Sequence, residues 1–465
     1  MKKNLYFTIL NLALATCLFS CKKDNVATDN VKPVVTLPDE ITKNRTLKSD
    51  TIYTFYSVLV TNNAILTIEP GTVIKSRDLA GGKGRSEPFV IDRGAKIMAV
   101  GTSDKPIIFT SGSPVAQRQH GDWSGLYILG KAPVSAYDEN TGGEATEIKL
   151  KGSNGLFPFG GGDNPADNSG VLKYVRIEFA GFSSGDTYGL ACVGVGSGTV
   201  IENVEVSYTQ TSGFGFYGGA VNARNLVAFN NRLAGFVYAN GYKGKQQFLV
   251  SYKHPYFAAA NGFTYTCDAV LLYNDLQNNP LTASTRPVIS NLTAIGPYNN
   301  PGYNDALPWN AAVNINYGSA IALRNSVLMG MPKGGIKFGD DFAAQHLLDG
   351  TTEFGYNLAH SNNPGEAFTI DINNVYSVDS AAVNTYAFAH GNKRYDSPAL
   401  IGLTDPFNFA SPGLLPKAGS DALTGANFDG SDYGAFFTKV NYRGAFGTDN
   451  WMTGWTNFYP VTTNY

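Results

Sequence analysis

Charged side chains are scarce in this sequence. Only 15% of its 465 residues are Asp, Glu, Lys or Arg, and 35 basic residues are balanced by 37 acidic ones. A surface that binds nucleic acid needs an excess of basic side chains to neutralise phosphates. The composition therefore excludes nucleic acid as a partner.

Cysteine is also scarce, because only Cys192 and Cys267 follow the first 21 residues. A chain of this length with two cysteines is not a disulfide scaffold. We expect the two thiols to be buried and unpaired, and a bond between them stays an open alternative because their spacing does not decide it.

Long amphipathic helical patterns are missing too. Instead, short runs rich in Val, Ile and Phe alternate with polar residues and are bounded by Gly, Pro, Asn or Asp, which is typical of strands. The lack of helices that could connect parallel strands argues against a fold of alternating β-α units. The sequence predicts an all-β chain; such runs occupy residues 65–76, 95–100, 105–111, 125–130 and 171–181.

A repeated phrase indicates how these strands are arranged. The frame apolar-x-Asn-(apolar or Ser)-x-apolar recurs around Asn203, Asn225, Asn291 and Asn325, and a version around Tyr174 lacks the asparagine. The first two copies are 22 residues apart, which is the size of one coil of a parallel β-helix with about three strands. Asparagine tolerates the left-handed backbone of a sharp corner. We predict a right-handed parallel β-helix with these asparagines stacked at one corner and their amides bonded to one another.

The N-terminus resembles an export signal. Lys2 and Lys3 precede an apolar run of signal-peptide length that ends in Leu18-Phe-Ser-Cys21. This ending resembles the lipobox of bacterial lipoproteins, which implies cleavage before Cys21 and its lipidation; a rival reading uses Cys17. The lysines that follow weakly resemble a signal for the cell surface. We predict a signal peptide over 1–20, a tether over 21–38, the β-helix over 39–400 and a C-terminal cap over 401–465.

Several blocks, in order, resemble a family of exported parallel β-helix lipoproteins of Gram-negative bacteria that are similar to pectate lyases in fold. They are "ILTIEPGTVIKS", "GAKIMAVGTSDKPIIFTSG", "GDWSGLYILGKAP", "GGAVNARNLVAFNN", "GYKGKQQF" and "NYRGAFGTDNWMTGWTNFYP", and they cover most of residues 60–460. Relatives often carry aspartates that resemble cation sites around "GFGFYGGAVN" and "GYKGKQQF". Here Ser, Gly and Ala stand instead, so the calcium implied by the resemblance does not carry over, and no cofactor or metal is predicted.

A catalytic cluster is hard to find in the sequence. Elimination on an acidic glycan needs Arg or Lys beside carboxylates that hold calcium, and hydrolysis needs paired carboxylates. The nearest candidates are Lys173, Arg176 and Glu178, of which the last two share one face of a strand by alternation. A solvent-facing pair on the outside of the sheet is the simpler interpretation. The five histidines show no zinc-binding spacing.

Aromatic residues are dense between 208 and 265, and more follow in the loop 296–310. Outward tyrosines offer a flat apolar face with a polar tip, which suits a sugar ring or a protein partner, whereas inward ones are core. The candidate ligand-binding residues are Tyr217, Tyr238, Tyr242, Tyr298, Tyr303 and Trp309.

These observations predict an outer-membrane lipoprotein, held by lipid on Cys21 and facing the exterior. Its β-helix would be a non-catalytic scaffold for a glycan or for an outer-membrane protein, as in a nutrient-uptake complex. Two alternatives remain. One is a polysaccharide lyase or glycoside hydrolase, which rests on analogy of fold alone, and the other is a purely structural surface protein.

Overall fold

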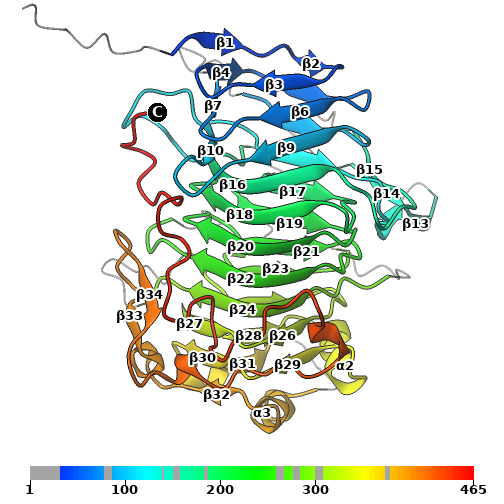
Figure 1. The fold of residues 1–465 in the computed structure, drawn as a ribbon. Helices are drawn as coiled ribbons and strands as arrows, with labels where there is room; N and C mark the ends of the chain where they lie inside the picture. Colours follow the sequence, from blue (N-terminus) through cyan, green and yellow to red (C-terminus); the bar gives the residue numbers. More distant parts are fainter. Residues whose placement is uncertain are drawn as a thin grey trace, which may run out of the picture. The chain divides into compact units, whose positions relative to one another are not determined.

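The computed structural model describes residues 32–77, 86–138, 141–149, 158–182, 187–257, 266–275, 283–298, 307–371 and 378–465. The described residues between 34 and 394 form the right-handed parallel β-helix that the repeat predicted (Figure 1). The strands of successive coils lie beside one another in two long parallel sheets, which we call sheet A and sheet B.

Sheet A contains 17 strands within the described residues: β1 (Val34–Thr36), β3 (Arg45–Leu47), β4 (Ile52–Phe55), β6 (Ile65–Ile68), β7 (Val73–Ser76), β9 (Lys96–Val100), β10 (Ile107–Thr110), β16 (Gly170–Glu178), β18 (Val200–Ser207), β20 (Asn222–Phe229), β22 (Lys245–Tyr252), β24 (Val288–Ile295), β26 (Ala322–Arg324), β27 (Val327–Met331), β29 (Glu353–Gly355), β30 (Leu358–Ser361) and β32 (Lys393–Arg394). Sheet B contains 11, counted over the same part of the chain: β2 (Glu40–Ile41), β5 (Val58–Val60), β8 (Phe89–Ile91), β11 (Leu126–Leu129), β17 (Tyr188–Val193), β19 (Ser212–Tyr217), β21 (Phe236–Ala239), β23 (Val270–Leu272), β25 (Val313–Ile315), β28 (Ile336–Phe338) and β31 (Phe368–Ile370).

The remaining elements are short. Three antiparallel pairs join β12 (Ala136–Asp138) to β13 (Gly143–Ala145), β14 (Glu147–Ile148) to β15 (Gly160–Gly161), and β33 (Leu403–Asp405) to β34 (Gly413–Pro416). The helices in the described part of the chain are α2 (Asp341–Leu348) and α3 (Ser380–Ala389), with short 3-10 helices η1 (Pro364–Glu366), η2 (Pro398–Ile401), η3 (Asp421–Leu423) and η4 (Ser431–Tyr433).

The predicted corner lies inside sheet A. Val200 of β18 pairs with Asn222 of β20, which gives the 22-residue coil. Within each of the strands β16, β18, β20, β22 and β24, and between β26 and β27, one residue adopts a left-handed backbone that bends the coil. The corner residues have φ between 51° and 60°; they are Tyr174, Asn203, Asn225, Phe248, Asn291 and Asn325.

The predicted bonding between asparagine side chains is wrong. The Asn291 amide donates to the carbonyls of Tyr442 at 3.0 Å and Gly444 at 3.1 Å, and the Asn325 amide donates to the carbonyl of Asn427 at 3.0 Å. Phe248 also interrupts the row of asparagines. The Asn291 and Asn325 side chains therefore point outward and hold a later part of the chain.

That part is the return segment, which we define as residues 424–465. It runs back along the outside of sheet A instead of closing the end of the solenoid, as the red trace in Figure 1 shows. Its backbone is held by Asn325 at Asn427, by Gln247 at Thr438 and by Glu205 at Asn457. The predicted cap over 401–465 is therefore corrected, because these residues cover the side of the coil.

The far end of the core is closed by α3. Val383 and Ala387 on this helix are buried in the main apolar cluster, and Tyr386 packs on Phe354 with ring centroids 5.0 Å apart. Asp379 begins the helix by accepting a hydrogen bond from the Ala382 amide at 2.7 Å. The capping helix thus lies within the range that the sequence assigned to the β-helix.

Both cysteines that follow the N-terminal region are free and buried, as predicted. Cys192 lies in the main core, and the Cys267 thiol donates to the Arg232 carbonyl at 3.0 Å. Among the described residues, no helix is long and apolar enough to cross a membrane. Cys17 and Cys21 lie outside the described residues.

Candidate functional site

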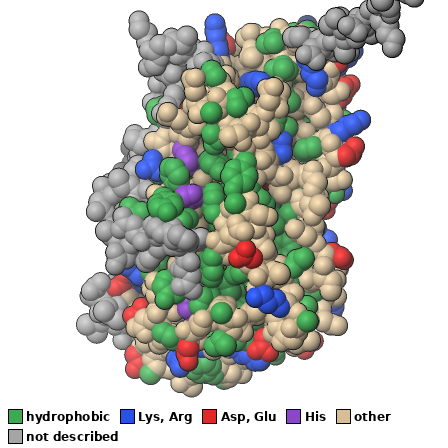
Figure 2. Space-filling model, turned by 90° about the vertical axis from the view of Figure 1, so that its left-hand side faces the viewer, with side chains coloured by type: hydrophobic (Ala, Val, Ile, Leu, Met, Phe, Trp, Pro, Cys, Tyr) green, Lys and Arg blue, Asp and Glu red, His purple; other side chains and the backbone are tan. Residues whose placement is uncertain are grey.

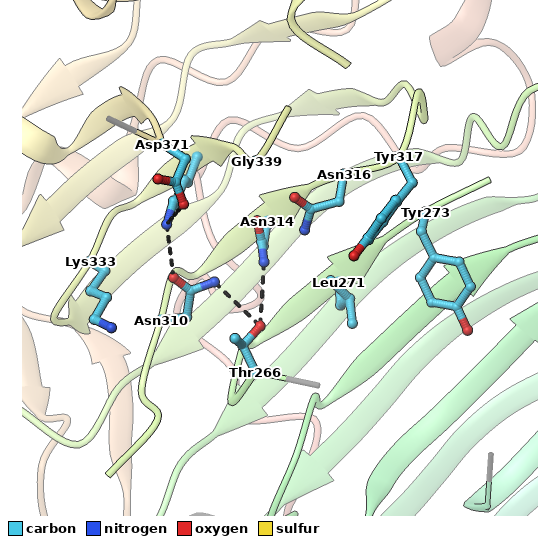
Figure 3. A pocket seen from close by; sticks show the side chains of 11 residues that line it. Thr266, Leu271, Tyr273, Asn310, Asn314, Asn316, Tyr317, Lys333, Gly339 and Asp371 are labelled. Carbon is cyan, nitrogen blue, oxygen red and sulfur yellow. Dashed lines mark hydrogen bonds and ion pairs between the residues drawn. The ribbon is translucent and has the colours of Figure 1, made fainter. Parts of the chain in front are cut away.

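A polar pocket of about 290 Å³ opens on the outside of sheet B, near the last coils of the solenoid. Figure 3 shows the amides of Asn310 and Asn314 and the hydroxyl of Thr266 pointing toward one another at its centre. Lys333 lies at one end and Tyr317 at the other. We call this the sheet B pocket.

The parallel register of the strands places its side chains in a row. Leu271 of β23 pairs with Asn314 of β25, which pairs with Lys337 of β28. Because side chains alternate between the two faces of a strand, these three point outward while their neighbours fill the core. Side chains from three successive coils therefore meet at one place.

A buried carboxylate fixes the two amides at the centre. Asp268 is fully buried and accepts hydrogen bonds from the amide nitrogens of Asn310 at 2.9 Å and Asn314 at 3.2 Å. It also accepts from the Ala311 amide at 3.0 Å and from the Thr266 hydroxyl. Burial raises the pKa of Asp268, and these donors oppose the rise. Asp268 therefore sets which way each amide points.

The amide oxygens are consequently turned away from Asp268. The Asn310 oxygen accepts from the Lys337 ammonium at 3.3 Å, and Lys337 is also paired with Asp371 at 3.2 Å. The Asn314 oxygen is buried and has no hydrogen-bond partner among the described residues. A buried acceptor without a partner costs free energy, so the wall of the pocket holds an unsatisfied acceptor at Asn314.

The opposite end of the pocket depends on tight packing. The Asn316 amide oxygen lies where a side chain on Gly339 would be, only 1.4 Å from the position of a Cβ atom there. Beside it, the Tyr317 backbone has φ of 49° and its amide donates to Asp340, the residue that caps α2. This turn presents the half-buried Tyr317 ring to the pocket.

Four of the predicted ligand-binding aromatics are buried, and the prediction for them is wrong. Tyr238 and Tyr242 stack inside the coil at 5.4 Å, and Gln246 bonds both hydroxyls. Trp309 is 1% exposed in a small cluster of its own. Tyr217 lies on the outside of sheet B but is 2% exposed, so it offers no face to solvent.

Tyr217 nevertheless contacts a residue that lines the sheet B pocket. Its hydroxyl is 2.8 Å from that of Tyr273, which lines the pocket, and it also contacts the Tyr188 hydroxyl. Tyr298 is half-buried, and its ring stacks on His360 at 5.7 Å. Tyr303 lies outside the described residues.

The candidate catalytic residues lie on the outside of sheet A. Arg176 and Glu178 share one face of β16, as predicted, with 3.4 Å between Nε and Oε1. Both are buried, because the return segment covers them and the Tyr465 hydroxyl donates to Glu178 at 2.6 Å. The solvent-facing interpretation is therefore wrong. Lys173 is half-exposed and pairs with Glu202 at 3.2 Å.

Glu205 belongs to the same buried group as Arg176 and Glu178, and it was not identified from the sequence. It is the partner of Arg176 on the next coil and is fully buried. One of its oxygens accepts from the Asn457 amide at 2.8 Å, and the other has no hydrogen-bond partner in the described chain. Burial raises the pKa of Glu205 to about 8, and Arg176 opposes this rise. Burial also raises the pKa of Glu178.

The arrangement of these groups limits the chemistry that they offer. A base or a calcium-holding carboxylate must touch the substrate, whereas Arg176, Glu178 and Glu205 lie beneath residues 457–465. Within the described ranges, no three His, Cys, Asp or Glu side chains are grouped so as to hold a metal ion. The sheet B pocket, in contrast, is open to solvent and is lined mainly by polar side chains.

The sequence did carry a signal for this pocket. In "NAAVNINYG", Asn310, Asn314 and Asn316 recur at even spacing, which places all three on one face of a strand. Nothing local marked Asp268 or Lys337, because they arrive from neighbouring coils.

Comparisons with known proteins concern the coil as a whole. The family model described as "Pectate-lyase like beta helix domain" matches residues 39–393. A solved structure, the crystal structure of pectate lyase Pel9A, is similar with a TM-score of 0.42 and 11% sequence identity, over 83% of this chain and 88% of that chain. No curated protein matches the sequence. A likeness to a solved structure at this level carries no information on activity.

Proposed function

This chain belongs to the family of pectate-lyase-like β-helix domains, and from that premise we propose that it is a non-catalytic scaffold that binds a glycan in the sheet B pocket. The observation that supports this is the Asn314 amide oxygen, a buried acceptor without a described partner whose direction is fixed by Asp268. Pre-set polar groups in a concave site are typical of ligand binding.

Sugar hydroxyls match the chemistry of the lining. A hydroxyl donates and accepts at once, so it would satisfy the Asn314 oxygen and accept from the exposed Lys333 ammonium. The Tyr317 ring supplies a flat apolar surface on which the carbon-hydrogen face of a pyranose ring packs. Asn316 adds an amide at that end.

We further propose that the protein is an outer-membrane lipoprotein held by lipid on Cys21 and facing the exterior. The support is the basic and apolar N-terminus that ends in Leu18-Phe-Ser-Cys21. Mass spectrometry of the protein from membranes would detect the lipidated cysteine. An N-terminal segment that carries no lipid, or lipid on Cys17, would contradict the assignment to Cys21.

Binding is tested with the purified protein and a panel of polysaccharides, by gel retardation and calorimetry. Replacing Asn314 with Ala removes the acceptor and should weaken binding about tenfold or more. Lys333→Gln should weaken it less. Lys131→Gln, which changes an exposed lysine far along the chain, is the matched control and should bind like the wild type.

The alternatives predict different results. Release of reducing ends or unsaturated products would favour a lyase or a hydrolase. Binding that Asn314→Ala leaves unchanged would overturn the proposed pocket. A protein partner in an uptake complex would instead be recovered in a pull-down through the lipidated protein, and a purely structural role predicts neither glycan nor partner.

A further inference from the structure

A second pocket lies at the bend that joins the C-terminal ends of sheet A strands to sheet B. It encloses about 490 Å³ and is lined by side chains that include Arg118, Arg232, His120, Tyr208 and Phe257. Val461 of the return segment forms part of its wall. We call it the arginine pocket, and it shares no lining residue with the sheet B pocket.

One wall of the arginine pocket is aromatic. The His120 ring stacks on Phe257 with centroids 4.5 Å apart and planes 29° apart, and it lies 5.2 Å from the Tyr208 ring. Histidine side chains lie among hydrophobic ones on the face drawn in Figure 2. Burial lowers the pKa of His120 to about 4, and the Arg232 charge adds to this effect. The ring is therefore neutral at neutral pH and acts as a flat, weakly polar surface.

The second feature of the pocket is Arg232, which forms no ion pair with a carboxylate in the described chain. None of the residues described as lining the pocket is Asp or Glu. Within the described ranges, no carboxylate forms an ion pair with Arg232, and its Nε is buried without a hydrogen-bond partner. Arg232 is half-buried, so its guanidinium is partly removed from water without an anion beside it, which costs free energy.

Arg118 differs from Arg232 in this respect. It is 6% exposed and donates to the carbonyls of Pro460 and Thr463, both at 2.7 Å. Its guanidinium therefore holds the return segment in place and adds positive charge to the pocket. Arg232 is left to bind an anion, with a planar fork suited to a carboxylate.

We propose that the arginine pocket binds an aromatic carboxylate, with the ring against His120 and Phe257 and the carboxylate on Arg232. The aromatic wall and the unpaired cation lie within one cavity, so a single flat anion engages both. A carboxylate would supply the anion that Arg232 lacks within the described ranges.

An aromatic ligand fits this lining better than a sugar acid does. A pyranose needs hydrogen-bond partners for several hydroxyls. Besides the two arginines and the His120 imidazole, the polar side chains that line the pocket are only Gln119, Gln210 and Tyr208. The Tyr208 hydroxyl already donates to the Phe458 carbonyl at 3.0 Å. Flat rings, in contrast, gain from offset stacking on His120 and Phe257.

The test is calorimetric titration of the full protein with 4-hydroxycinnamate. The wild type should bind it, and the neutral amide of the same acid should bind about tenfold or more weakly, because it lacks the charge-assisted bond. Arg232→Gln should cause a similar loss, and Arg232→Lys should restore part of it. Phe257→Leu should weaken binding of the acid and of the amide by the same factor, because it alters only the stacking surface.

Two controls separate this site from the sheet B pocket and from loss of structure. Lys333→Gln should leave cinnamate binding unchanged, and Arg232→Gln should leave the far-ultraviolet circular dichroism spectrum unchanged. Equal binding by the wild type and Arg232→Gln would overturn the proposal. So would glucuronate binding as tightly as the cinnamate, or the absence of any binding at millimolar concentrations.

Discussion

The buried acid Glu205, on the outside of sheet A, leads to a quantitative prediction about how stability depends on pH. One of its carboxylate oxygens accepts a hydrogen bond, and the other has no partner in the described chain. Burial raises its pKa from 4.5 to about 8 in the folded protein. Between these pH values the folded state keeps a proton that the unfolded state has lost. The contribution of Glu205 to stability is therefore greatest below pH 4.5 and decreases as the pH rises toward 8.

The magnitude follows from the same numbers. Each pKa unit corresponds to about 1.4 kcal/mol, so the rise from 4.5 to about 8 corresponds to a loss of roughly 5 kcal/mol across the window. Glu205→Gln cannot titrate, yet it keeps an oxygen to accept from the Asn457 amide. We expect Glu205→Gln to match the wild type near pH 4 and to become progressively more stable than it toward pH 8.

The assay is thermal and urea-induced unfolding of both proteins at a series of pH values from 4 to 8. Comparing the two at each pH cancels the titration of every other group. The control is Glu202→Gln on the same strand, where Glu202 is half-exposed and paired with Lys173. Loss of an exposed pair changes stability by about 1 kcal/mol or less. A difference between Glu205→Gln and the wild type that does not vary with pH would refute the reasoning.

Three further predictions concern other parts of the coil. Gly339→Ala would drive a Cβ into the Asn316 amide, so glycan binding should weaken and stability should fall by about 1–3 kcal/mol, measured by calorimetry and urea unfolding. Asn225→Ala should destabilise by about 1 kcal/mol because its φ is 57°, whereas Asn225→Gly should not; equal melting temperatures of the two variants would contradict this. Burial lowers the pKa of His360 to about 4, so its contribution to stability should be lost as the pH falls from 6.5 to 4, by up to about 3 kcal/mol. Melting experiments on a His360→Gln variant should show that this part of the acid sensitivity is missing.

The coil could be predicted from the sequence because successive coils repeat the same pattern of residues. The asparagine frame gave the 22-residue coil and the left-handed corner, and both are confirmed. The same alignment also contains a pair that was not recognised. Placing "LKYVRI" over "IENVEV" puts Arg176 opposite Glu205, which is the register that the structure has.

Contacts across the chain were not predictable in this way. The bond between Glu205 and the Asn457 amide joins residues 252 positions apart, and the return segment carries no repeat that would give its register. The buried state of Arg176 and Glu178 depends on this segment. Alternation along β16 could assign their face but not what covers it.

The tyrosine predictions failed for a related reason. Alternation separates Phe216, which is inward, from Tyr217, which is outward, but it does not say whether the outward face meets solvent. Tyr217 packs with Tyr188 and Tyr273 in an apolar cluster on the outside of sheet B. Where both faces of a strand are buried, an aromatic on either face is part of the packing.

The coverage of sheet A also decides where ligands can bind. Phe428, Tyr433 and Phe437 cover Val288 and Ala322 on one half of the sheet, and the Trp451 region covers the other half. A long polymer cannot lie along this face unless the return segment leaves it, which would expose apolar side chains to water. Binding is therefore expected on sheet B and at the bend between the sheets, where Asn314 and Arg232 present polar groups that the described chain leaves unsatisfied.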